Sequence, residues 1–135
     1  MPLINWNDTL SVNVNEIDQQ HKNLIRMINE LNDAMKQGKG RTVIGKIIKD
    51  MIDYTTTHFK TEEGYFDRFG YPEAAGHKRE HALFVEKVSA FSKGFEEEKL
   101  SLSIEVLDFL SDWLKNHIKG TDRKYSEFFN RKGLS

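Results

Sequence analysis

The side chains of this sequence with the greatest capacity for chemistry are its five histidines, because the chain contains no cysteine. Without thiolates, disulfide bonds and iron–sulfur ligation are both excluded. Imidazoles are common metal ligands, and carboxylates are the other ionisable donors that such a site can use. Any metal ion would therefore be held by His, Asp and Glu. The histidines are His21, His58, His77, His81 and His117.

Helical spacing links several of these residues. Glu62 follows His58 by four positions, and His81 follows His77 by four. Residues four apart lie on one face of an α-helix, so each pair can point toward one site. One such pair is a weak metal signal, since a lone inward histidine is more often a hydrogen-bonded core residue. The choice between these two interpretations depends on the elements that carry the histidines.

Four helices are predicted to position these residues, because apolar side chains recur in steps of three and four along each segment. Asp18 is predicted to cap the first helix, and Pro72 suits the first turn of the third. A non-helical arm, 1–17, precedes the helices, and a short helical piece, about 121–130, follows them. The predicted helices cover about 18–37, 41–69, 72–96 and 101–118.

The predicted fold class is all-α, an up-down-up-down antiparallel four-helix bundle that forms one domain over residues 1–135. Short loops make consecutive helices antiparallel neighbours, and a chain of this length fits one hydrophobic core. In this topology all five histidines and Glu62 fall at one end of the bundle. Buried imidazoles cannot all satisfy one another by hydrogen bonding, whereas a metal ion takes up their lone pairs. The sequence therefore predicts a metal site.

These motifs match a known family. His58-x3-Glu62, His77-x3-His81 and His117-x4-Asp122 resemble the ligand signature of hemerythrins, with His21 as a further ligand. The similarity covers nearly the whole chain and is closest to the bacterial members. The segments that carry the bacterial likeness are Trp6, Val12 and Val14, the run Ile17-Asp18-Gln19-Gln20-His21, and Gly70-Tyr71-Pro72.

The resemblance implies a diiron site with an oxo or hydroxo bridge. One iron would take His77, His81 and His117, and the other would take His21 and His58, with Glu62 and Asp122 bridging the two. Glu63 is expected to point off the inward face, into solvent or at most to the edge of the site.

Asp122 departs from ideal helical spacing. Residues five apart lie about 140° apart around a straight α-helix, so Asp122 should not share a face with His117. Gly120 lies between them. We therefore predict a distorted or interrupted helix at Lys119 to Thr121.

The resemblance also implies the activity, which is reversible binding of O2 for carriage, storage or delivery, without catalysis. Five imidazoles, two bridging carboxylates and a single-atom bridge leave one coordination position open, on the iron with two histidines. Diiron oxygenases instead use four carboxylates and two histidines. The lining of the O2 pocket is expected to be apolar. Its candidate residues are Leu24, Ile25, Phe59, Trp113, Leu114 and Tyr125.

Some of these roles stay open at this point. Trp113 is either an ordinary core aromatic or a ring over the site, and Tyr125 either packs in the core or hydrogen-bonds at the edge of the site. Trp6 is expected to hold the arm against the bundle. The alternative functions are an O2- or redox-sensing domain with the same diiron site, an enzyme acting on peroxide, NO or iron, and a zinc-binding bundle.

Charge and hydropathy exclude other classes of partner. The 20 basic and 21 acidic side chains give a net charge of −1, with no basic surplus for binding nucleic acid. No apolar run is long enough to cross a membrane. The first residues lack the features of a signal peptide, so a cytoplasmic protein with O2 as its partner is expected.

Overall fold

The computed structural model describes residues 4–38, 41–96 and 104–135. The described part of the chain is helical throughout its regular structure and contains no strand. Two short elements accompany the α-helices: η1, a 3-10 turn at Asp8–Leu10 before the first, and η2, a π-helical turn at His117–Asp122 between the last two. The α-helices are α1 (Asn15–Lys36), α2 (Arg41–Phe69), α3 (Ala74–Glu96), α4 (Ile104–Asn116) and α5 (Arg123–Arg131).

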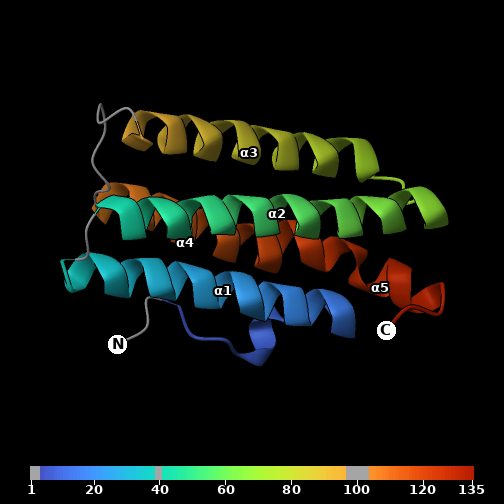
Figure 1. The fold of residues 1–135 in the computed structure, drawn as a ribbon. Helices are drawn as coiled ribbons and strands as arrows, with labels where there is room; N and C mark the ends of the chain where they lie inside the picture. Colours follow the sequence, from blue (N-terminus) through green and yellow to red (C-terminus); the bar gives the residue numbers. More distant parts are fainter. Residues whose placement is uncertain (1–3, 39–40, 97–103) are drawn as a thin grey trace.

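The helices form the predicted antiparallel four-helix bundle. Figure 1 shows α1, α2 and α3 running side by side in alternating directions, with α4 lying behind α2. The segments α4, η2 and α5 follow one another without a non-helical residue between them. None of the described helices is long and apolar enough to cross a membrane.

The arm is shorter than predicted and contains the 3-10 turn η1. Helix α1 begins at Asn15 rather than at 18, and the residue before it, Val14, makes no side-chain capping bond. Asp18 is therefore not the cap. Its carboxylate instead accepts the backbone N–H of Val12 at 2.8 Å and the hydroxyl of Ser11 at 2.6 Å, which ties the arm to α1.

The other predicted boundaries differ by a few residues. Pro72 lies in the turn before α3, which begins at Ala74, because Gly70 ends α2 in a left-handed conformation (φ +69°) and the chain needs further residues to reverse. The C-terminal helix α5 begins after Asp122 and ends at Arg131. The predicted start of the fourth helix, at 101, lies outside the described residues.

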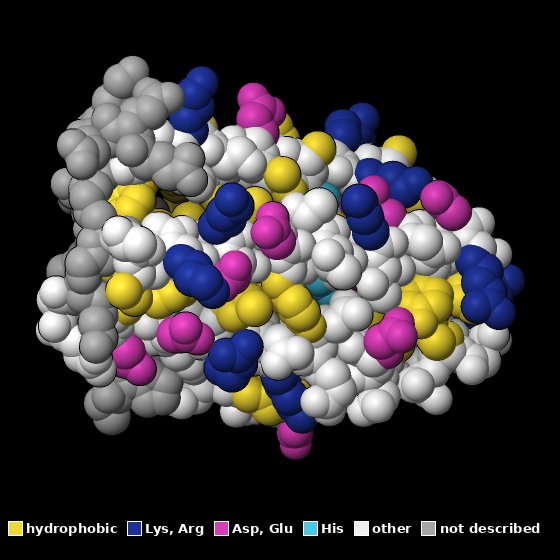
Figure 2. Space-filling model, in the orientation of Figure 1, with side chains coloured by type: hydrophobic (Ala, Val, Ile, Leu, Met, Phe, Trp, Pro, Cys, Tyr) yellow, Lys and Arg dark blue, Asp and Glu magenta, His cyan; other side chains and the backbone are white. Residues whose placement is uncertain are grey.

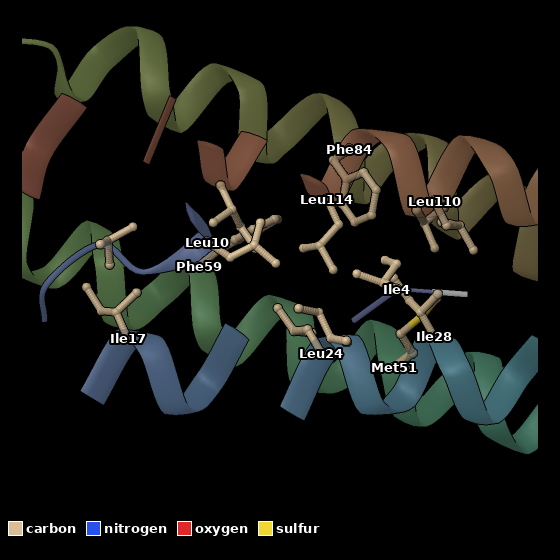
Figure 3. Packing of buried hydrophobic residues seen from close by; sticks show 14 of the residues in the cluster. Ile4, Leu10, Ile17, Leu24, Ile28, Met51, Phe59, Phe84, Leu110 and Leu114 are labelled. Atoms are coloured by element: carbon tan, nitrogen blue, oxygen red, sulfur yellow. The ribbon is translucent and has the colours of Figure 1, made fainter. Parts of the chain in front are cut away.

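The arm and the helices share one core. Leu10 and Val12 from the arm are no more than 1% exposed and belong to one hydrophobic cluster that has members from every α-helix. Figure 3 shows these apolar side chains converging from the arm, α1, α2, α3 and α4. Burial of each such side chain contributes roughly 1.5–3 kcal/mol. The core members labelled there are Ile4, Leu10, Ile17, Leu24, Ile28, Met51, Phe59, Phe84, Leu110 and Leu114.

Candidate metal centre

All seven predicted ligands lie together in the interior of the bundle. Their exposed fractions lie between 0% and 4%, so this part of the core is polar where the rest is apolar. Helix α1 supplies His21, α2 supplies His58 and Glu62, α3 supplies His77 and His81, and η2 supplies His117 and Asp122. The antiparallel topology brings these four places to the same level of the bundle.

The ligand atoms fall into two groups, and within each group they lie within 4.8 Å of one another. The two carboxylates belong to both groups, whereas each histidine belongs to one. The larger group contains His77, His81 and His117, and the smaller contains His21 and His58. We call the larger the three-histidine group and the smaller the two-histidine group.

The carboxylate of Asp122 lies between the two groups. Its Oδ1 is 2.8 Å from Nε2 of His77 and 3.0 Å from Nε2 of His117. Its Oδ2 is 3.1 Å from Nε2 of His21. One oxygen thus faces each group, which is the arrangement that a bridging carboxylate requires.

The π-helical turn η2 places Asp122 there. It spans His117–Asp122 and confirms the predicted distortion at Lys119 to Thr121. A π-turn closes its hydrogen bonds between residues five apart and is frequent at functional sites. Gly120 has space around it, because a Cβ added there would meet nothing within 4 Å. An alanine side chain would therefore fit at this position of the π-turn.

Glu62 also faces both groups. Its Oε1 is 2.9 Å from Nε2 of His58 and 3.6 Å from Nε2 of His81. Its Oε2 accepts a hydrogen bond of 2.5 Å from the hydroxyl of Tyr125. Tyr125 therefore hydrogen-bonds at the edge of the cluster. Burial raises the pKa of its hydroxyl well above the ordinary value.

Several buried atoms of the cluster lack hydrogen-bond partners, and others face only another imidazole. Within the three-histidine group, Nε2 of His117 lies 3.2 Å from Nε2 of His77 and 3.1 Å from Nε2 of His81. Buried polar atoms without partners are costly, and bound metal ions would take up these lone pairs. The donor set of imidazoles and carboxylates fits such an ion. The unpartnered buried atoms are Nδ1 and Nε2 of His21, Oε1 of Glu62, and Oδ1 and Oδ2 of Asp122.

The pKa values of two neighbouring histidines in the cluster shift in opposite directions. Burial, followed by the nearby His117 and His77, lowers the pKa of His81 to about 2. Burial opposes protonation of His117 as well, but the Asp122 carboxylate raises its pKa to about 9. Although burial alone would raise the pKa of Asp122, the imidazoles around it, His117 foremost, hold it well below the usual range. The cluster therefore favours an ionised carboxylate with cationic charge beside it.

Aromatic rings cover the three-histidine group. Phe59 stacks on His81 with centroids 3.7 Å apart and ring planes 3° apart. Trp113 stacks on His117 at 4.3 Å and 12°, so this indole lies over the cluster. Tyr125 lies against His77 at 5.7 Å and 21°. The rings add apolar surface on the outer side of the imidazoles.

The remaining pocket candidates divide between the interior and the surface. Leu24 and Leu114 are buried, and Figure 3 shows them pointing into the same part of the core from α1 and α4. Ile25 is buried too, but it also lines a surface groove with Trp6 beside the arm. Nζ of Lys22 lies over the ring of Trp6, 5.1 Å from its centre, so Trp6 packs against α1.

Three side chains contact the outer nitrogens of the imidazoles, and sequence reasoning missed two of them, Gln20 and Glu80. Gln20 Oε1 lies 2.6 Å from Nδ1 of His58, and Glu80 Oε1 lies 3.3 Å from Nδ1 of His117. Glu63 Oε2 lies 3.0 Å from Nδ1 of His81, so Glu63 borders the site rather than only solvent. Burial raises the pKa of Glu63. A polar residue next to a ligand was the only sequence signal for these contacts.

The surface over the cluster carries charges of both signs. Figure 2 shows basic and acidic side chains intermixed on this face, with only small areas of histidine visible between the helices. No side of this view is dominated by one charge, which agrees with the net charge of −1.

The fold and the cluster define a helical-bundle protein with a buried set of histidines and carboxylates able to hold metal ions. A family model described as the hemerythrin HHE cation-binding domain matches residues 12–129. The chain therefore belongs to the hemerythrin family, as its motifs predicted.

Individual relatives agree with this assignment. The chain is 38% identical to a bacteriohemerythrin of Stenotrophomonas maltophilia over 94% of this chain and 82% of the relative. It is 36% identical to a bacteriohemerythrin of Methylococcus capsulatus over 93% of this chain and 95% of the relative.

Solved structures show the same fold. A crystal structure of wild-type hemerythrin aligns with a TM-score of 0.88 and 35% identity over 93% of this chain and 96% of that one. A mutant of hemerythrin aligns with a TM-score of 0.90 and 34% identity over 94% of this chain and 97% of that one.

Proposed function

We propose that this protein binds O2 reversibly at a diiron centre. The observation that carries the proposal is the division of seven buried ligands into a three-histidine and a two-histidine group that share both carboxylates. His77, His81 and His117 would hold one iron and His21 and His58 the other, with Glu62 and Asp122 common to both. Two irons in these positions would supply the electrons and the open coordination position for O2.

The side chains around the cluster suit binding better than turnover. Phe59, Trp113 and Tyr125 cover the three-histidine group, and Leu24 and Leu114 are buried nearby. Apolar walls exclude water and protons, which would otherwise drive irreversible oxidation. The donor set is rich in neutral imidazoles, whereas oxygen-activating diiron sites use mostly carboxylates.

Tyr125 has a separate part in this arrangement. Its hydroxyl donates to Glu62, so it holds one oxygen of a carboxylate that faces both groups. A hydrogen bond to a ligating carboxylate orients that ligand.

An anaerobic titration tests the proposal. The iron-loaded protein is reduced with dithionite, desalted, titrated with O2 while the visible spectrum is recorded, and then sparged with argon. We expect a coloured species at one O2 per two irons that bleaches on sparging. A permanently oxidised product would overturn reversible binding and favour redox sensing. Steady turnover of peroxide or NO would favour an enzyme, and metal analysis showing zinc in protein grown with iron would reject the diiron centre.

A further inference from the structure

The outer nitrogens of the histidines are held differently in the two groups. In the three-histidine group, carboxylates accept from two of the imidazoles: Glu63 from His81 and Glu80 from His117. In the two-histidine group the neutral amide of Gln20 accepts from His58. Nδ1 of His21 is buried and has no partner. The described contacts therefore place anionic acceptors beside one group alone.

Glu80 is itself held in place by the element that carries His117. The hydroxyl of Thr121, in η2, donates to Glu80 at 3.0 Å from Oε1 and 3.3 Å from Oε2. Glu80 lies on α3 between His77 and His81, so its carboxylate connects α3 to η2. Its side chain is 46% exposed, and the His117 ring that it contacts is 3% exposed.

Glu63 connects two helices in the same way: it lies on α2 and accepts from His81 of α3. It lines a surface groove with Phe59, Lys78 and His81, and its side chain is 31% exposed.

A carboxylate acceptor changes the imidazole that donates to it. It draws the Nδ1 proton toward itself, raises the basicity of the inward Nε2, and adds negative charge near the metal. A neutral amide orients the ring in the same way but adds no charge. Two carboxylates beside one group and none beside the other therefore make the two positions chemically unequal.

We infer that Glu63 and Glu80 are positioning residues that make the three-histidine position bind its metal more tightly, and favour ferric iron more strongly, than the two-histidine position. This inference rests on the two-metal centre of the proposed function. The anionic hydrogen-bond partners then lie beside the three-histidine position, which has no open coordination position for O2. The two-histidine position, where O2 would bind, keeps the more electron-poor ligands.

Cobalt titration of the metal-free protein tests the inference without O2 or activity. Co(II) is added to wild type, and each binding step is followed by its visible spectrum and by calorimetry. We expect two steps of unequal affinity, with His21→Ala removing the weaker one. Glu63→Gln and Glu80→Gln should each weaken the tighter step by about 10–100-fold and leave the weaker step unchanged. Gln20→Glu should strengthen the weaker step.

Glu86→Gln is the matched control, since Glu86 lines the same groove as Glu63, and it should leave both steps unchanged. In iron-loaded protein, the Glu80→Gln variant should also raise the midpoint potential of the more easily oxidised iron. Two cobalt steps in wild type that neither Glu63→Gln nor Glu80→Gln alters would overturn the inference and leave the proposed function standing. Fewer than two metal ions per chain in wild type would overturn both.

Discussion

At the scale of single residues, the cluster combines groups that are unfavourable without a bound cation. Five imidazoles and two carboxylates are almost fully buried, and several of their inward atoms have no hydrogen-bond partner. An uncompensated buried polar group costs roughly 1–3 kcal/mol. A sequence selected only for stability would have apolar residues in this layer. The polar layer is therefore a functional feature of the core.

Asp122→Ala tests the shared carboxylate. Because Asp122 faces both groups, its loss should reduce iron content from two per chain to below one, as measured by metal analysis. Ser111→Ala is the control, since Ser111 is a buried polar residue outside the cluster, and it should keep two irons. Full iron loading of Asp122→Ala would contradict the assignment of Asp122 as a ligand.

Tyr125→Phe tests the hydrogen bond to Glu62. Removing the hydroxyl leaves Glu62 Oε2 without this donor, and we expect a loss of about 1–3 kcal/mol in the free energy of unfolding by urea. Tyr54→Phe is the matched control, because its hydroxyl accepts from Asn23 at an exposed site, and it should change stability by less than about 0.5 kcal/mol. Equal effects of the two variants would rule out a special role for the buried contact.

At the scale of elements, η2 decides which way Asp122 points. A regular α-helix would turn Asp122 about 140° away from His117, whereas both side chains are buried in the cluster. The same turn carries Thr121, which holds Glu80. One local change in helical winding thus positions Asp122, which faces both histidine groups, and Thr121, which holds the partner of His117.

Two glycines, Gly120 in η2 and Gly70 after α2, should respond differently to replacement by alanine. A Cβ at Gly120 would meet nothing within 4 Å, and its φ is not positive, so Gly120→Ala should keep both metals and gain about 0.5–1 kcal/mol. Gly70 ends α2 with φ +69°, so Gly70→Ala should lose about 1–2 kcal/mol. Urea unfolding and metal analysis check both variants. Loss of metal in Gly120→Ala would show that the π-turn requires the glycine after all.

At the scale of the whole molecule, the N-terminal arm contacts the C-terminal helix α5. Ser126 of α5 donates its hydroxyl to the carbonyl of Val12, and Asn130 donates to the carbonyl of Asn13 at 3.0 Å. Asp18 binds the same stretch from α1. The arm therefore links α5 to α1, and α5 directly continues η2.

Leu10→Ala tests the contribution of the arm. Leu10 is 1% exposed, so the cavity left by truncation should cost about 2–5 kcal/mol in the free energy of unfolding. Asn5→Ala, at an exposed position in the same arm, should change it by less than about 0.5 kcal/mol. A small effect of Leu10→Ala would mean that the arm detaches without disturbing the bundle.

Removal of bound metal should lower the thermal stability of the whole molecule. Metal bound only to the folded state at 1,000 times its Kd contributes about 4 kcal/mol. Chelation should therefore lower the Tm by roughly 10–20 °C, and reloading should restore it. Differential scanning calorimetry of the loaded, stripped and reloaded protein makes the comparison. An unchanged Tm would indicate that the apo cluster is already satisfied by other means.

The sequence by itself determined the bundle and the meeting of the five histidines with Glu62, whereas Asp122 and the distorted helix before it were predicted from the resemblance to hemerythrins. The bundle and the histidine layer follow from spacings of three and four residues, which are local properties of a helix. His58 and Glu62 share a face because they are four apart. Short loops then align the helices, so the end at which the histidines meet follows from the chain order.

Only the tertiary structure decided the partners that come from other helices. Asp18 binds the arm instead of capping α1, and Glu80 reaches His117 across the space between α3 and η2. Such contacts depend on how each helix is rotated about its axis and on which rotamer its side chains adopt. Packing of the whole core sets both quantities, and no spacing along one segment encodes them. The unequal surroundings of the two histidine groups are therefore a property of the fold.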